Sequence, residues 1–382
     1  MKLVLIAIVV GSMACVPGTM TGSSGEQGVP SDVASEEVLD AGAVDGSRRD
    51  VSGADDVEPD SAPDVLVGVE DSGAMEDVGG SEEDGPDAEP QDDRIYTVAV
   101  IADMNESYGS THHRQTVHDA MAWIVDQIAP DVVLSTGDMV AGQQAGHDYR
   151  AMWQAFHAAV TTPITTAGIP LAVSPGNHDA SGYASFAAER EIFVDEWKQQ
   201  RPAVNFLDET NYPLHYAFEI GPALFISLDA TRVGPLNGDQ RQWVANILET
   251  YQDYPIKFIY GHIPLFPVAQ GRETEILQDF ELERILNDYG VQMMISGHHH
   301  AYYPGRRGSL QLMHTACLGA GPRRLITQSE VSERSVIVIH YDASGILSSE
   351  AYGGADFQRV IERSSLPESL NTGDLLIYRD DL

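Results

Sequence analysis

The chain has 382 residues and is strongly acidic, with 58 Asp and Glu against 22 Lys and Arg and a formal net charge of −36. Proteins that bind nucleic acid neutralise its phosphates with clustered Lys and Arg, so this composition argues against a nucleic-acid partner and favours small substrates. Only Cys15 and Cys317 are present, which excludes a scaffold held by several disulfides, and nothing in the sequence indicates an obligate protein partner.

The first 15 residues follow the plan of an export signal. Lys2 supplies a positive start, and Leu3 to Val10 is an apolar run that is too short to span a bilayer. Ser12 to Ala14 suits ordinary signal cleavage, and Cys15 directly after it resembles a bacterial lipobox, although Ser12 stands where most lipoboxes have Leu. We expect export from a bacterial cytoplasm, with lipid attachment at Cys15 as the membrane contact. Soluble export and a plain apolar N-terminus are the alternatives.

Residues 16–93 form an acidic segment of low complexity. They include 23 acidic and 2 basic residues, more than half of the net charge, and no Phe, Tyr, Trp or His. So little apolar surface cannot offset the entropy lost on ordering, which predicts a disordered linker. Its charges repel one another, so it would serve as an extended tether for a domain over residues 94–382.

The rest of the chain has the pattern of the α/β class, because short runs rich in Val and Ile alternate with amphipathic stretches. The strands expected from this pattern are Thr97 to Ala102, Val132 to Ser135, Leu171 to Ser174, Lys257 to Tyr260 and Gln292 to Ser296. The expected helices are His113 to Ile128, Asp148 to Val160, Ala184 to Lys198, Asp239 to Tyr251 and Glu273 to Asp288. Two further segments, His215 to Asp229 and Ser335 to Ala351, predict hairpins and therefore mixed sheets.

Polar side chains follow each of the five expected strands at the point where the strand ends. They are Asp103, Asp138, Asn177-His178, His262 and His298 to His300. Ligands of α/β sheets bind in the crevice beyond the carboxyl ends of the strands, so these residues are expected to converge. Carboxylates, an amide oxygen and imidazoles form a mixed ligand set that suits Mn, Fe, Zn or Ni. So many ligands favour two metal ions, roughly 3.5 to 4 Å apart, that share one Asp and catalyse displacement at phosphorus.

These motifs resemble, in order and spacing, the series that marks the calcineurin-like metallophosphoesterases. They are Asp103, Gly137-Asp138, Gly176-Asn177-His178-Asp179, Gly261-His262 and Gly297-His298-His299-His300. The resemblance covers roughly residues 95 to 302, and Gly-Asn-His-Asp followed much later by Gly-His-x-His is a specific pairing. It implies two packed mixed β-sheets flanked by α-helices, a four-layer αββα fold.

The resemblance also implies a role for each matching residue. Two divalent metal ions would be bridged by Asp138, with Asp103 and His300 on the first ion and Asn177, His262 and His298 on the second. His178 would not bind metal, because in the family this His faces the substrate, stabilises the transition state and protonates the leaving oxygen. A hydroxide that bridges the metals would be the nucleophile. The implied function is hydrolysis of phosphate mono- or diesters, and the sequence leaves the choice between them open.

One position departs from the family pattern, whose first motif is normally Asp-x-His, because this chain has Asn105 in place of the His. The amide of Asn105 offers a neutral carbonyl oxygen, a weaker and harder ligand than imidazole. Three interpretations follow: Asn105 or water fills the position in an active enzyme, His112 or His113 replaces the missing ligand, or catalysis is impaired. The last interpretation leads to the alternative function, a surface-tethered binding protein that keeps the phosphoesterase fold.

Several neighbouring positions have their own interpretations. His299 is expected to point away from the two flanking His, since side chains of an extended segment alternate. Asp179 could orient the imidazole before it or cap a helix. Tyr302 and Tyr303 could line a substrate pocket or close the core. Cys317 lies in an apolar run and is expected to be a core thiol.

Overall fold

The computed structural model describes residues 94–319, 321–373 and 375–382. The expected export signal, with its lipid attachment at Cys15, and the expected linker over residues 16–93 lie outside the described residues. In the part of the chain that is described, no helix has both the length and the apolar character needed to cross a membrane.

The first sheet has six strands and is mixed. Its order is β13 (Arg359–Val360), β12 (Gly345–Gly353), β11 (Val336–Asp342), β1 (Tyr96–Ile101), β2 (Val132–Ser135) and β3 (Leu171–Val173). The last three strands in this order run parallel, and β1 pairs with β11 antiparallel. The pairing of β11 with β12 confirms one of the two predicted hairpins.

The second sheet has nine strands and is also mixed. Its order is β14 (Ser369–Asn371), β15 (Leu376–Arg379), β9 (Tyr303–Arg307), β10 (Leu310–His314), β8 (Met293–Ser296), β7 (Ile256–Gly261), β6 (Ala223–Ser227), β5 (His215–Ile220) and β4 (Asn205–Asn211). β6, β7, β8 and β10 are parallel neighbours. The antiparallel pair of β5 and β6 confirms the other hairpin.

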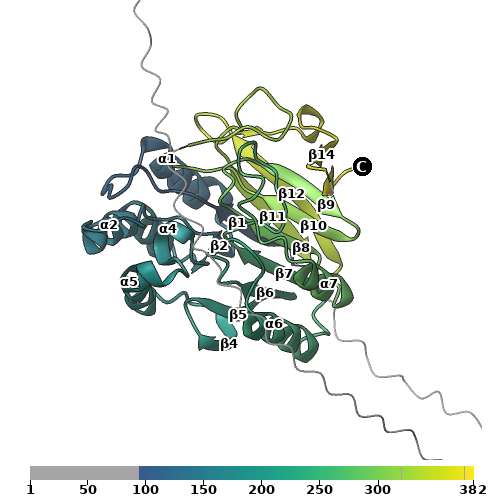
Figure 1. The fold of residues 1–382 in the computed structure, drawn as a ribbon, viewed down its shortest axis with the longest axis horizontal. Helices are drawn as coiled ribbons and strands as arrows, with labels where there is room; N and C mark the ends of the chain where they lie inside the picture. Colours follow the sequence, from purple (N-terminus) through teal and green to yellow (C-terminus); the bar gives the residue numbers. More distant parts are fainter. Residues whose placement is uncertain (1–93, 320, 374) are drawn as a thin grey trace, which may run out of the picture. The chain divides into compact units, whose positions relative to one another are not determined.

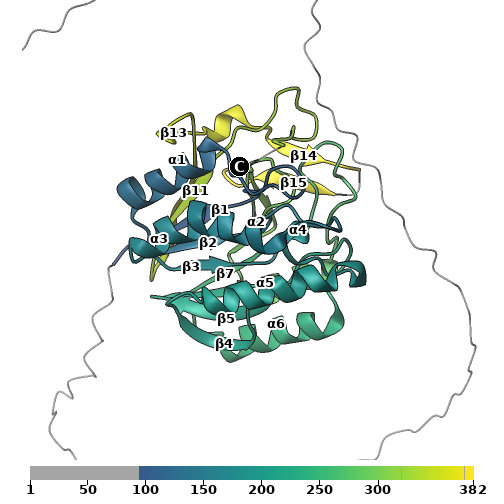
Figure 2. The ribbon, with the colours of Figure 1, turned by 90° about the vertical axis from the view of Figure 1, so that its left-hand side faces the viewer.

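Helices cover the outer face of each sheet (Figure 1). The first sheet packs against α1 (Gln115–Trp123), α2 (Tyr149–Phe156), α3 (Thr162–Thr166) and α5 (Ala187–Gln199), which face the viewer in Figure 2. The second sheet packs against α6 (Gly238–Thr250) and α7 (Phe280–Asp288). The remaining helical segments are α4 (Asn177–Ala180), π-helical turns at Ile124–Ile128 and His157–Thr161, and 3₁₀ turns at Ala184–Phe186 and Arg363–Ser365. The layers are therefore helix, sheet, sheet and helix, which confirms the fold that the family resemblance implies.

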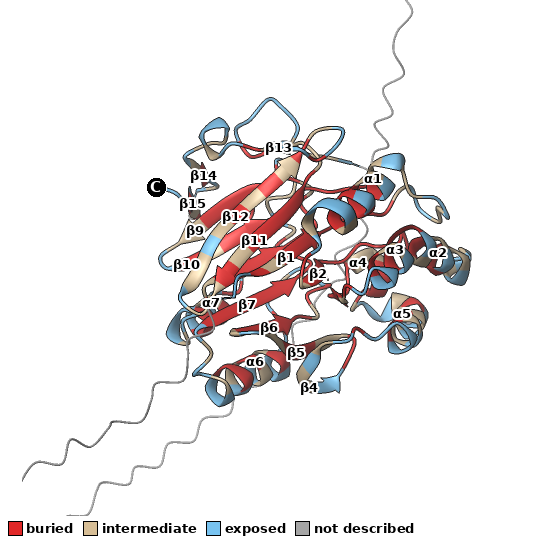
Figure 3. Ribbon diagram, turned by 180° about the vertical axis from the view of Figure 1, so that it is seen from behind, coloured by how far each residue is buried: buried red, intermediate tan, exposed pale blue. Residues whose placement is uncertain are grey.

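Side chains along β1 alternate between two apolar cores, which explains why the two sheets stack. Ala99 and Ile101 face the helices of the first sheet, whereas Val98 and Val100 belong to the core between the sheets. The strands at the centre of the molecule are accordingly buried on both faces, as their red colour in Figure 3 shows. The hydroxyl of Tyr341 in the first sheet also donates to the carbonyl of Ile220 in the second, at 2.9 Å.

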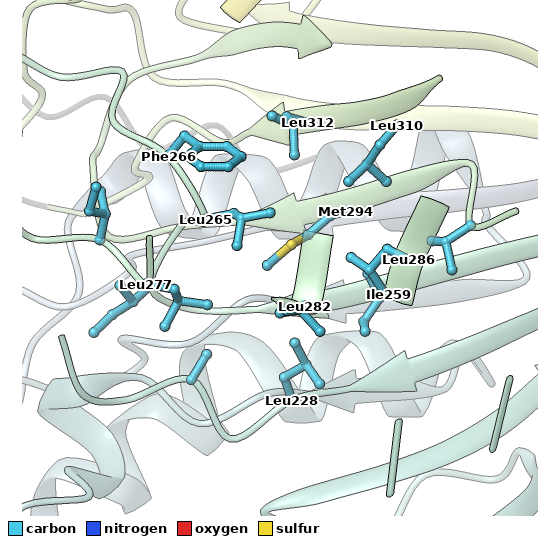
Figure 4. Close-up of a cluster of buried hydrophobic side chains, with 14 of the residues drawn as sticks. Leu228, Ile259, Leu265, Phe266, Leu277, Leu282, Leu286, Met294, Leu310 and Leu312 are labelled. Carbon is cyan, nitrogen blue, oxygen red and sulfur yellow. The ribbon is translucent and has the colours of Figure 1, made fainter. Parts of the chain in front are cut away.

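A third core lies between the second sheet and the helices α6 and α7 (Figure 4). In it Leu282 and Leu286 of α7, four residues apart on one helical face, pack with Ile259 of β7 and Met294 of β8. Burial of each such side chain contributes roughly 1.5 to 3 kcal/mol. This packing fixes β7 and β8, the strands that precede His262 and the Gly-His-His-His motif.

The structure corrects one predicted helix, since α7 begins at Phe280 rather than at Glu273. The carboxylate of Asp279 accepts from the backbone N–H of Leu282 at 3.0 Å and so caps the helix there. Gln278, which precedes Asp279, has a φ of 45°, and a residue of a right-handed helix has a negative φ. Residues 273–279 instead form an irregular loop.

Candidate metal centre

The candidate residues follow the carboxyl ends of parallel strands in both sheets. Asp103 follows β1, Asp138 follows β2, Asn177 and His178 begin α4 after β3, His262 follows β7, and His298 and His300 follow β8. Three of these strands are parallel neighbours in the first sheet and two in the second, so their carboxyl ends deliver the side chains to one region.

The charged and imidazole groups fall into two clusters that share one carboxylate. Asp103, Asp138 and His300 form the first cluster, and Asp138, His262 and His298 form the second. Within each cluster the atoms that could bind a metal all lie within 4.8 Å of one another. This spacing brings the three groups of each cluster close enough to be candidate ligands of one metal ion. The donor sets suit a transition metal. Asp138 belongs to both clusters, and its bridging of two ions, which the family resemblance implies, stays a prediction.

His262 lies at the centre of the second cluster. The Nε2 atom of His262 lies 3.3 Å from Asp138 Oδ1, 2.8 Å from Asn177 Oδ1 and 3.2 Å from His298 Nδ1. Separations of about 3 Å are those of neighbouring ligands at right angles around one ion with bonds of about 2.1 Å. The amide oxygen of Asn177 therefore joins the three groups as a candidate fourth ligand.

In the first cluster, His300 Nε2 lies 3.2 Å from Asp103 Oδ1. The carboxylate of Asp103 also accepts the backbone N–H of His298, at 3.1 and 3.2 Å to its two oxygens. Asp103 thus ties the loop after β1 to the loop after β8, and it links the two clusters directly.

The ring nitrogens that face away from the centre have hydrogen-bond partners. The carbonyl of Thr136 lies 2.9 Å from His262 Nδ1, and the carbonyl of Gly321 lies 2.8 Å from His300 Nδ1. A carbonyl only accepts, so both Nδ1 atoms carry the proton and both Nε2 atoms are left for a metal. Imidazoles that bind metals in proteins are oriented by outer partners of this kind.

Four candidate ligands have backbone conformations that residues other than glycine rarely adopt. Their φ angles are 49° at Asp103, 53° at Asp138, 65° at His298 and 51° at His300. Left-handed backbone costs of order 1 to 3 kcal/mol per residue and concentrates at functional sites. Gly176 has a steric role, because a Cβ there would lie 2.1 Å from the backbone nitrogen of Asp138. The glycine of the Gly-Asn-His-Asp motif thus lets two ligand loops touch.

Burial and close charges shift the pKa values of the second cluster. Burial alone would lower the pKa of His262, but the Asp138 carboxylate raises it to about 9. Burial and the adjacent His262 hold the pKa of His298 well below its usual value. Burial would raise the pKa of Asp138, yet His262 and His178 hold it well below the usual range. The cluster therefore contains an anionic carboxylate and a proton on His262 that a metal ion would displace.

His178 lies beside the clusters without joining either of them. Its Nδ1 is 3.2 Å from the carbonyl of Gly142, and its Nε2 is 4.0 Å from Asp138 Oδ2. The carbonyl accepts a hydrogen bond from Nδ1, and Nε2 is the ring nitrogen on the side of Asp138. The ring of Tyr108, 46% exposed, lies 5.3 Å from that of His178 between centroids. The position of His178 suits a residue that contacts the substrate, and that role stays a prediction.

Asn105 is buried beside the first cluster, and its backbone N–H donates to the carbonyl of Asp138 at 3.1 Å. Neither His112 nor His113 joins a cluster of candidate ligands among the described residues. The Nδ1 of His113 lies 3.0 Å from the carbonyl of Met104, and its ring packs against Phe156. Asn105 as a ligand of the first cluster therefore stays a prediction.

The neighbouring residues have structural partners. His299 is buried, and its Nδ1 accepts a hydrogen bond from the backbone N–H of Val268 at 3.2 Å. The positive φ angles of His298 and His300 show that this segment is not the extended one that was predicted. Asp179 accepts from the backbone of Gly176, Met139 and Val140 and so caps α4 and holds the loop after Asp138. Buried in the core are Tyr302, Tyr303 and Cys317.

Two polar residues near the centre have no signal in the sequence analysis. Glu275 Oε2 lies 3.2 Å from His298 Nε2, and Gln143 accepts the side-chain N–H of Asn177 at 3.0 Å. Both come from irregular loops outside the recognised motifs. An acidic or amide residue in a loop is too common to be singled out without the contact itself.

The chain belongs to the calcineurin-like phosphoesterase family, whose model matches residues 96–302. Purple acid phosphatase 15 of Arabidopsis thaliana is 24% identical over 234 residues, which cover 55% of this chain and 41% of that protein. The chain thus spans less than half the length of this relative.

Two solved structures share the fold. Purple acid phosphatase PPD1 from yellow lupin (Lupinus luteus) seeds is 18% identical with a TM-score of 0.52, over 69% of this chain and 52% of that one. GAP50, the anchor in the inner membrane complex of Plasmodium, is 13% identical with a TM-score of 0.50, over 69% and 86% of the two chains.

Proposed function

We propose that this protein is a metal-dependent hydrolase of small phosphate esters. The observation that carries the proposal is the shared carboxylate of Asp138, which belongs to both clusters of candidate ligands. A structural metal site needs one closed set of ligands, whereas a shared Asp is the arrangement of centres that hold two ions for hydrolysis. Family membership and the purple acid phosphatase relative support the same class of activity.

Two divalent ions, when bound, would lower the pKa of water and offset the negative charge of a phosphate ester. Asp138 would hold both ions, with Asp103, His300 and Asn105 on one side and Asn177, His262 and His298 on the other. The Mn, Fe, Zn or Ni type is favoured by the mixed donor set.

His178 would act on the substrate rather than on the ions. Its Nδ1 is held by the carbonyl of Gly142, so the ring cannot turn without losing that bond, and Nε2 stays directed to the side of the centre where Asp138 lies. There it would donate a hydrogen bond to a phosphate oxygen and protonate the leaving oxygen. No Ser or Cys nucleophile is required by this scheme.

The test is metal content and turnover of the purified chain. We expect close to two metal ions per chain and hydrolysis of an aryl phosphate monoester or diester with Mn²⁺ present. Comparing both ester types across several metals would establish the substrate class. A protein that binds no metal and hydrolyses neither ester would sink the proposal.

A second candidate function is a non-catalytic, surface-tethered binding protein. Asn105 favours it, since the first cluster lacks the imidazole that the family pattern places there. The fold alone does not decide, because GAP50 shares it and is an anchor protein. Two bound metals without turnover of any ester would favour this alternative.

Export and lipid attachment are also proposals, supported by the apolar run before Cys15. Expression in a bacterium with a labelled fatty acid should place the label on the chain, and Cys15→Ser should remove it. An unlabelled but exported chain would favour ordinary signal cleavage.

A further inference from the structure

His298 differs from the other two candidate imidazole ligands in its outer partner. Backbone carbonyls accept from the outer nitrogens of His262 and His300, whereas the side-chain carboxylate of Glu275 meets the outer nitrogen of His298, with Oε2 3.2 Å from Nε2. A carboxylate carries a full charge and a carbonyl only a dipole, so the hydrogen bond from His298 is the charge-assisted one.

We propose that Glu275 is a positioning residue that orients His298 and strengthens metal binding at the second cluster. The proposal rests on the metal-dependent function argued above. A carboxylate only accepts, so the proton of the His298 ring is placed on Nε2, and Nδ1 keeps its lone pair. Nδ1 is the atom that lies 3.2 Å from His262 Nε2, inside the cluster. Glu275 therefore selects the tautomer that can bind metal there.

The charge of Glu275 has a second consequence for His298. A carboxylate at the outer nitrogen makes the imidazole a more basic ligand. About a third of the Glu275 side chain is exposed.

Glu275 is itself held in place by three contacts. Arg272 pairs with the same carboxylate oxygen, and the backbone N–H of Glu275 donates to the carbonyl of Arg272 at 3.0 Å. The carbonyl of Glu275 accepts from His299 Nε2, also at 3.0 Å. Two consecutive histidines of the motif thus contact Glu275: His298 contacts its side-chain carboxylate, and His299 contacts its backbone carbonyl. This double link fixes the loop over residues 273–279 against the candidate ligands.

The test compares metal affinity in the full chain and in two matched variants. Glu275→Gln keeps the shape and a neutral acceptor but removes the charge, whereas Glu283→Gln removes the charge of another ion-paired glutamate, bound to Arg307 at 2.8 Å. After removal of metal with a chelator, Zn²⁺ or Mn²⁺ is titrated back in competition with an indicator. We expect Glu275→Gln to weaken one of two metal sites by about 10- to 100-fold and Glu283→Gln to change neither.

A spectroscopic signature separates positioning from general destabilisation. With Co²⁺ bound, the ring N–H proton of His298 should give a shifted NMR signal, and its exchange with water should be faster in Glu275→Gln. Glu275→Asp keeps the charge one methylene further away and should give an intermediate affinity, which provides a second variant if the first folds poorly.

Unchanged affinity and exchange in both Glu275 variants would overturn the role of Glu275 while leaving the proposed function intact. Equal losses in Glu275→Gln and Glu283→Gln would overturn it too, because the effect would then be one of stability. A parent chain that binds no metal would overturn the proposed function together with this inference.

Discussion

The two clusters share Asp138 but differ in how completely they are built. In the second, His262 Nε2 lies 2.8 to 3.3 Å from donors of Asp138, Asn177 and His298. His262, Asn177 and His298 follow three strands that belong to both sheets. Around the first, Asp103 and His300 supply the donors, and Asn105 occupies the position of the family's third ligand. The second cluster also has the charged outer partner Glu275. We therefore expect the second metal to be held more tightly than the first.

If this expectation holds, one fold carries two adjacent metal sites that bind their ions at different strengths. The ligands of both clusters follow the ends of the same set of strands. The expected difference in metal affinity therefore comes from single residues rather than from the fold. A substitution at a shared ligand should then affect both sites, one at an unshared ligand should affect a single site, and one beside the clusters should affect turnover alone.

The largest effect is expected from Asp138→Asn, which removes the one charge that both clusters share. Loss of both ions should reduce turnover by at least about 10⁴-fold, since enzymes accelerate reactions by roughly 10⁶-fold or more. Metal analysis and ester hydrolysis measure the two losses. The control is Asp131→Asn at the other end of β2, whose carboxylate accepts the backbone N–H of Thr97 at 2.8 Å. A variant at Asp138 that still binds two ions would contradict the shared role.

The next effect separates turnover from metal binding. His178→Ala should lower kcat by about 10²- to 10⁴-fold, the usual contribution of a positioned proton donor, and leave metal content unchanged. His262→Ala should lower both, because only His262 belongs to a cluster. Metal content per chain and kcat, measured on both variants, test the difference. Loss of metal in His178→Ala would show that this residue acts as a ligand.

The sequence predicts the strands that carry the site more fully than it predicts the contacts between the loops. All five strands that precede the candidate residues form where the apolar runs indicate, because such runs report burial directly. β9 was not anticipated, since it contains Pro304, Gly305 and two arginines. The contact of Glu275 with His298 joins residues 23 positions apart across an irregular loop. Local sequence patterns do not predict contacts of this kind, because the contacts depend on how the loops pack.

Replacing Asn105 by the histidine of the family pattern is expected to reduce the difference in metal affinity between the two clusters. Asn105→His places an imidazole beside Asp103 and His300, and imidazole binds Zn, Fe or Ni more strongly than an amide oxygen. The affinity of the weaker site should rise by about tenfold, or about 1.4 kcal/mol, while the stronger site stays unchanged. Asn105→Ala should act in the opposite direction. Stepwise titration of metal into the metal-free chain measures both. No change in either variant would mean that residue 105 does not contribute to the first site.

The smallest effect concerns the same loop, which carries Tyr108 next to His178. If this loop serves the substrate as well as the first metal, Tyr108→Ala should raise KM for an aryl phosphate by about 2- to 12-fold, the worth of an aromatic contact of 0.5 to 1.5 kcal/mol. KM for glycerol phosphate, which has no ring, should not change, and kcat should be preserved for both. Tyr378→Ala on β15, where the tyrosine is also 46% exposed, is the matched control. Equal rises in KM for both esters would assign Tyr108 to phosphate binding or to loop order, because a ring that stacks on an aryl group can discriminate only between substrates that differ in that group.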